Sequence, residues 1–156
     1  MNTYLLVKWL HILSATVLFG TGAGIAFFKW STDRSGNVSA IRVVAERTVL
    51  ADWLFTTPAI VLQPISGLAL VHLAGYPLFT GWVFVSLCLY LLAVCCWIPV
   101  VWLQLRMRAI ARTADREHAA LAQPYWAHTK TWFWLGVLAF VAFNAVFFLM
   151  VLKPAI

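Results

Sequence analysis

Four long apolar stretches limit what this chain can fold into more than any other feature of its sequence. At about 1.5 Å per helical residue, each is long enough to cross roughly 30 Å of hydrocarbon. They cover residues 4–28, 53–73, 82–103 and 132–152. Tryptophan or tyrosine stands near the ends of each stretch, as in the aromatic belts at the two surfaces of a membrane. The sequence therefore predicts an all-α membrane protein whose four transmembrane helices form a single domain, residues 1–156.

The composition leaves no polar shell for a separate soluble domain, since 63% of the residues are hydrophobic and only 10% are charged. The isoelectric point near 9.7 would suit nucleic-acid binding. However, the basic residues cluster at the ends of the apolar stretches, where they set orientation in a bilayer. We therefore expect the lipid bilayer as a partner and no nucleic acid.

The basic residues also predict the orientation of the chain. Nine of the 11 lysines and arginines lie between the first and second stretches or between the third and fourth. The middle connection, residues 75–81, carries no charge. By the positive-inside rule, both basic connections face the cytoplasm. We expect an antiparallel four-helix bundle in a bacterial inner membrane, with both termini on the outer, periplasmic side.

The first basic connection is expected to contain a short helix. Ile41, Val44 and Thr48 recur at helical spacing, and either Asn37 or Ser39 can cap its first turn. The second basic connection is expected to extend the third helix before the chain turns into the fourth.

The second apolar stretch contains unusual residues for a membrane span. Pro58 and Pro64 each remove an amide donor, which predicts a kinked helix. Gln63 must face a neighbouring helix, and Asn144 in the fourth stretch is the expected partner. The pair is either a structural hydrogen bond or a contact for a quinone or substrate.

Two histidines lie inside apolar stretches. His11 is seven residues from Tyr4, roughly 10 Å along a helix, and His72 is four residues before Tyr76, roughly 6 Å. Because adjacent spans run antiparallel, both imidazoles are expected at similar depth near the outer face. Two histidines at one level of a four-helix bundle suit axial ligation of a non-covalent haem b. The alternative for each is a hydrogen bond to a neighbouring helix or to the interface.

Lys8 precedes His11 by one helical turn, on the same face of the first helix. If His11 holds a haem, Lys8 is placed to pair with a propionate. Otherwise Lys8 extends to the lipid headgroups. Gly20 and Gly24 form a small-xxx-small pair, which serves either packing within the bundle or a homo-oligomer.

The first span, residues 4–12, resembles the opening of a group of small bacterial membrane proteins. This group includes the four-helix membrane protoporphyrinogen oxidase and the membrane domain of copper-resistance protein D. Its mark is an outer-half histidine in the first helix, often preceded by lysine or arginine, which Lys8 and His11 match. Other stretches resemble a sister family of predicted integral membrane proteins of unknown function. These are residues 19–22, 51–58, 63–67, 96–104 and 149–154.

The wider group implies haem b and redox work at the membrane. The resemblance thus favours a haem-b protein that passes electrons between a quinol pool and a partner near the outer face, in the role of a haem-dependent oxidoreductase. A protoporphyrinogen-oxidase-like enzyme acting on a tetrapyrrole is an alternative, although the oxidase's basic residue in a later span has no counterpart here. A copper-handling or scaffold subunit is a further alternative.

Overall fold

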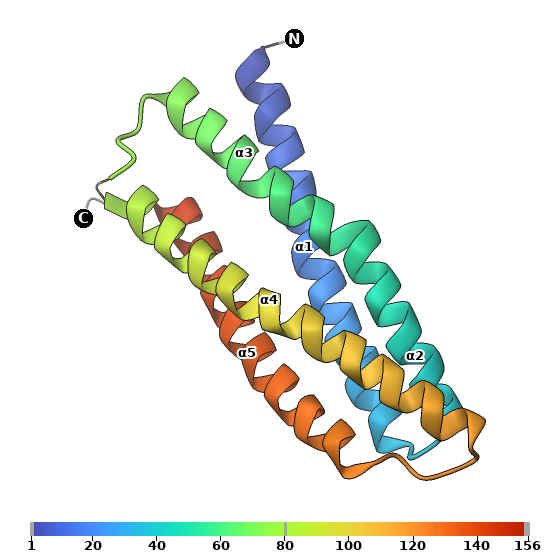
Figure 1. Cartoon of the computed structure of the whole chain (residues 1–156). Helices are drawn as coiled ribbons and strands as arrows, with labels where there is room; N and C mark the ends of the chain where they lie inside the picture. The colour runs from blue at the N-terminus through green and yellow to red at the C-terminus, as the bar shows by residue number, and fades with distance from the viewer. Residues whose placement is uncertain (1, 80, 155–156) are drawn as a thin grey trace.

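The computed structural model describes residues 2–79 and 81–154, and its regular secondary structure is helical throughout these ranges. The elements are α1 (Thr3–Arg34), α2 (Val38–Ala51), the π-helix η1 (Asp52–Thr56), α3 (Thr57–Ala74), α4 (Gly81–Arg116) and α5 (Gln123–Leu152). Figure 1 shows the turns that follow α1 and α4 at one end of the molecule and the start of α1 at the other.

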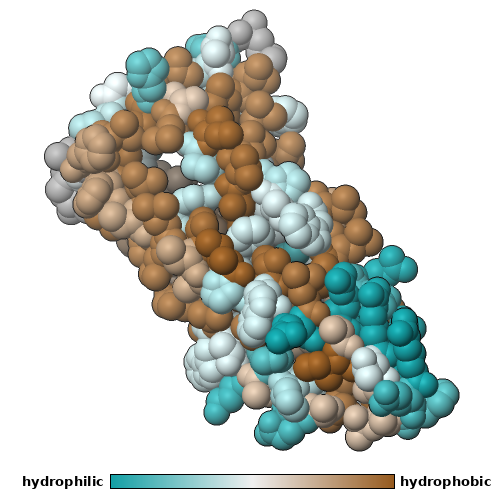
Figure 2. Space-filling model, in the orientation of Figure 1, coloured by the Kyte–Doolittle hydropathy of each residue, from teal (hydrophilic) through white to brown (hydrophobic). Residues whose placement is uncertain are grey.

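The four helices that the sequence predicts are present, and each is long and apolar enough to cross a membrane. They are longer than the predicted spans because α1, α2, α4 and α5 continue past the apolar residues at the end that holds the basic connections. Figure 2 shows this division, with apolar residues over most of the molecule and polar residues gathered at that end. Many large apolar side chains are exposed, as expected for a surface that faces lipid.

The predicted helix in the first basic connection is α2, and Asn37 caps it. The Asn37 side chain accepts a hydrogen bond from the amide of Ala40 at 3.0 Å. The chain then continues through η1 into α3 without a loop. The wide turn of η1 stands just before Pro58, which has no amide proton and whose ring crowds the preceding turn. The irregularity that the prolines predict is therefore a π-helical turn.

The apolar core lies in the half of the molecule that holds the basic connections. It joins α2, α4 and α5 through Ile41, Val100, Leu103, Met107, Ala111, Tyr125 and Trp132. A smaller cluster of Leu18, Ala59 and Ile60 joins α1 to α3. Figure 1 shows that the pair α1–α3 and the pair α4–α5 stand apart towards the N-terminal end of α1.

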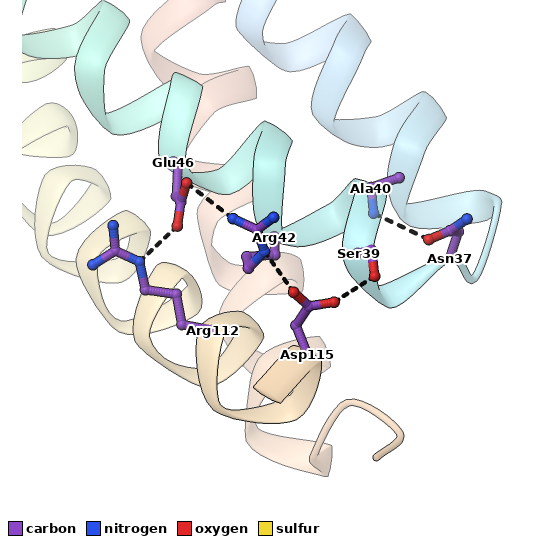
Figure 3. A network of polar contacts seen from close by, with 7 residues as sticks. All are labelled: Asn37, Ser39, Ala40, Arg42, Glu46, Arg112 and Asp115. Atoms are coloured by element: carbon purple, nitrogen blue, oxygen red, sulfur yellow. Dashed lines mark hydrogen bonds and ion pairs between the residues drawn. The ribbon is translucent and has the colours of Figure 1, made fainter. Parts of the chain in front are cut away.

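Beyond the apolar core, α2 is tied to α4 by charged side chains (Figure 3). Arg42 binds Asp115 at 2.7 Å and Glu46 at 3.2 Å, and Arg112 binds the other oxygen of Glu46 at 2.7 Å. Ser39 donates a hydrogen bond to Asp115. This hydrogen bond and the pairing with Arg42 lower the pKa of Asp115, and the hydrogen bond from Arg112 with the nearby positive charges lowers the pKa of Glu46.

We expect acid to weaken this connection. A carboxyl whose pKa is lowered by folding stabilises the protein fully above its ordinary pKa of about 4, and this stabilisation is lost as the pH falls through the folded value. The melting temperature should therefore stay level from neutral pH to about pH 5 and fall below about pH 4. The Asp115→Asn variant should show a smaller acid-dependent fall, measured by tryptophan fluorescence of the detergent-solubilised protein.

Glu117→Gln is the matched control, because Glu117 is exposed at the end of the same segment and makes no ion pair among the described residues. Equal acid dependence in both variants would contradict a stabilising role for the network. The effect should be small, since exposed ion pairs contribute little.

Candidate functional site

His11 lies in the contact between α1 and α3. Its side chain is buried, and its Nδ1 is 2.8 Å from the Oγ of Ser66. Gly67 allows this approach, because a Cβ atom at that position would stand 3.2 Å from His11 Cε1. The imidazole is therefore held against the backbone of α3.

The hydrogen bonds of Ser66 assign the tautomer of His11. A hydroxyl has one proton to donate, and Ser66 donates its proton to the carbonyl of Leu62 at 2.7 Å. The Oγ therefore accepts the bond from His11, so the proton of the neutral imidazole is on Nδ1. His11 Nε2 then carries a lone pair, and it makes no hydrogen bond within the part of the chain that the structure describes.

Gln63 completes the polar contact between α1 and α3. Its Nε2 donates to the carbonyl of His11 at 2.9 Å and to Ser14 Oγ at 2.6 Å. The expected bond to Asn144 is wrong. Asn144 is exposed, and its amide donates to the carbonyl of Phe140 in its own helix at 2.8 Å. Gln63 therefore fixes the backbone that carries His11.

The other two predicted site residues lie outside this contact. His72 is exposed in the last turn of α3, six residues beyond Ser66, or about 9 Å along the helix. Lys8 is exposed near the start of α1, with its Nζ 5.9 Å from the centre of the Tyr4 ring. The hydrogen bonds of the described residues do not link His11 to His72, so their joint ligation of one iron stays a prediction.

A second polar cluster, which the sequence reasoning missed, lies at the other end of α1. Lys29 is only 2% exposed, and its Nζ donates to Asp33 at 2.7 Å and to the Tyr125 hydroxyl at 3.0 Å. Tyr125 in turn donates to the second oxygen of Asp33 at 2.6 Å. The ammonium also lies 4.8 Å from the centre of the Tyr125 ring and 5.5 Å from that of Trp132.

The signal for this cluster was the spacing of Lys29 and Asp33, four residues apart on one helix. Lys29 directly follows the first apolar stretch, where a basic residue is expected to reach towards the lipid headgroups. In the structure it points inward instead, because Asp33 and the ring of Tyr125 offer partners there that offset the loss of hydration.

The chemistry of these two clusters is different. The His11 cluster offers one neutral nitrogen base, whereas the Lys29 cluster is a closed ion pair with a phenol. Among the described residues, no group of three or more histidine, cysteine, aspartate or glutamate side chains comes together to hold a metal ion.

In a comparison with protein families, residues 5–154 match a family described as "Predicted integral membrane protein (DUF2269)". Comparison with curated proteins found no match. Comparison with solved structures found none either.

We expect Gln63→Leu to destabilise the protein by about 1–2 kcal/mol, because Ser14 and the carbonyl of His11 lose their donor inside the helix contact. Asn144→Leu is the matched control, since that amide is exposed and bonds only within its own helix. Unfolding in mixed detergent micelles measures both variants. Similar losses for the two would contradict the role given to Gln63.

We expect Lys29→Met to destabilise the protein by about 3–5 kcal/mol, because it leaves the buried Asp33 carboxylate without its cation. The double variant Lys29→Met with Asp33→Asn should recover most of this loss, since it removes both charges and keeps an acceptor for the Tyr125 hydroxyl. The same unfolding measurement tests it. A single variant as stable as the wild type would show that Asp33 does not need Lys29.

Proposed function

The chain belongs to this family of integral membrane proteins, and we propose that it binds haem b and transfers electrons near the outer face of a bacterial inner membrane. The observation that carries the proposal is the hydrogen bond between His11 Nδ1 and Ser66 Oγ, which are 2.8 Å apart in the contact between α1 and α3. Ser66 holds the proton on Nδ1, which leaves Nε2 as a Lewis base. Histidine ligands of metals commonly donate their other ring N–H in this way, which fixes the ring and the tautomer.

The chain's own residues have distinct parts in this proposal. His11 would be an axial ligand, Ser66 would orient it, and Gln63 would fix the backbone of α1 at that point. Lys8 stands one turn closer to the start of α1, free to pair with a propionate. His72 is the proposed second ligand, and its position at the end of α3 means that this turn would have to move to reach the same iron. When bound, haem b supplies one-electron transfer.

An opening in the molecular surface supports the proposal. Figure 2 shows this opening in the half of the molecule that holds the start of α1. A flat, largely apolar tetrapyrrole is the kind of group that such a space in a helix bundle can take.

The topology that goes with this proposal is an antiparallel bundle with both termini on the outer side. The ion pairs of α2 with α4 would then lie in the cytoplasm, together with most of the basic residues. The cytoplasmic cations would hold this orientation, and the His11 contact would lie in the outer half. A quinol in the membrane is the proposed electron donor. A homo-oligomer is compatible with the small residues of α1.

The test is the visible spectrum of the protein purified with haem available. We expect a reduced α-band typical of haem b, lost in His11→Ala and altered in Ser66→Ala, because the second change frees the imidazole to rotate. His72→Ala is a separate variant. An unchanged spectrum in the His72→Ala variant would mean that a group other than His72 is the second iron ligand. The role proposed for His11 would not change.

A colourless protein that is folded, as judged by its melting temperature, would refute the haem proposal. Bound copper in place of iron would favour the copper-handling alternative. Restored growth of a strain that lacks protoporphyrinogen oxidase would favour the tetrapyrrole enzyme.

A further inference from the structure

A groove of about 430 Å³ opens on the surface between α1 and α5, at the end that holds the basic connections. It lies over the Lys29 cluster, at the opposite end of α1 from His11. Its lining comes from the last two turns of α1 and the first three turns of α5. The residues are Lys29, Trp30, Asp33, Arg34, Trp126, Thr129, Lys130, Trp132 and Phe133.

The free charge of the groove is positive. Lys29 is balanced by Asp33 at 2.7 Å, so this pair contributes no net charge. Arg34 and Lys130 are exposed on the two sides of the groove, and neither makes an ion pair among the described residues. Arg34 lies over the ring of Trp30, with its Cζ 5.2 Å from the ring centre. The groove therefore offers two cations to an anion.

A buried donor accompanies these cations. Trp132 is 8% exposed, and its indole N–H has no acceptor among the described residues. A buried N–H without a partner is costly, most of all near a bilayer. The nitrogen itself has almost no exposed surface, so the ring must turn before an acceptor in the groove can reach it. An oxygen atom of a bound anion is such an acceptor.

Three further aromatic side chains of the groove are exposed on the surface of the molecule. Trp30, Trp126 and Phe133 are 51%, 42% and 43% exposed. The groove stands where the first apolar stretch ends and the fourth begins, at the level expected for lipid headgroups. Tryptophan is favoured at this level because its ring contacts acyl chains while its N–H stays among polar groups.

We propose that this groove binds the phosphate headgroup of an anionic phospholipid. The two exposed cations meet the phosphate, the indole N–H joins them once its ring turns, and the aromatic wall meets the first carbons of the acyl chains. A neutral lipid offers no net charge to the cations. The inference is independent of the haem proposal, because it uses none of the same residues.

The experiment measures the affinity of the full-length protein for phosphatidylglycerol and for phosphatidylcholine by native mass spectrometry in a neutral detergent. We expect tighter binding of phosphatidylglycerol. The variant Arg34→Gln with Lys130→Gln should weaken that binding by roughly tenfold or more, because each cation near a lipid surface contributes to attraction. Trp132→Phe should weaken it severalfold, because it keeps an aromatic side chain and removes the N–H.

Arg47→Gln with Arg106→Gln is the matched control. It removes two exposed cations from the same end, and Arg106 lies 5.4 Å from the Trp102 ring centre, as Arg34 does against Trp30, but outside the groove. We expect a change of less than about twofold in this variant. Melting temperatures confirm that each variant is folded.

Three results would overturn the proposal. The first is equal loss of phosphatidylglycerol binding in both double variants, which would mean general attraction by surface charge. The second is equal affinity for the two lipids. The third is displacement of the lipid by an equal concentration of inorganic phosphate, which would mean a site for a free anion.

Discussion

Within a bilayer, a buried polar side chain has no water to bond, so each polar group between the helices must find its partner in the protein. The contact between α1 and α3 depends on this constraint. Four polar side chains form hydrogen bonds with one another and with two backbone carbonyls, and these bonds fix how the two helices pack. The side chains are those of His11, Ser14, Gln63 and Ser66. Because hydrocarbon lies on the outer side of both helices, apolar burial alone would not select this arrangement.

The two halves of the molecule are held by different forces. At the end with the basic connections, an apolar core and charged side chains join α2 to α4 and α5. Towards the start of α1, the polar cluster around His11 holds α1 to α3. Aromatic side chains join this pair to the other two helices, since Phe19 stacks on Phe140 of α5 and Tyr90 of α4 donates a hydrogen bond to the carbonyl of Ile60.

Sequence patterns predicted the helices well, because length and hydropathy decide which segments can cross a membrane. The Asn37 cap was also predictable, since capping depends on neighbouring residues alone. The partner of Gln63 was not, because sequence shows that an amide must be bonded but not which way its helix is turned. The direction of the Lys29 side chain could not be predicted for the same reason. Only the turn of α1 towards Tyr125 shows that the lysine faces inward.

The π-helical turn of η1 bears on how one long helix contacts different neighbours. Buried side chains recur at regular helical spacing from Ile41 through Asp52 to Ser66. In an unbroken α-helix, such a stripe would face one side throughout. The wider turn places more residues in one revolution, so the direction of the stripe changes there. Its first part meets α4 as well as α1, and its last part meets α1. An irregular turn thereby lets one buried stripe contact α4 before the turn and stay packed on α1 after it.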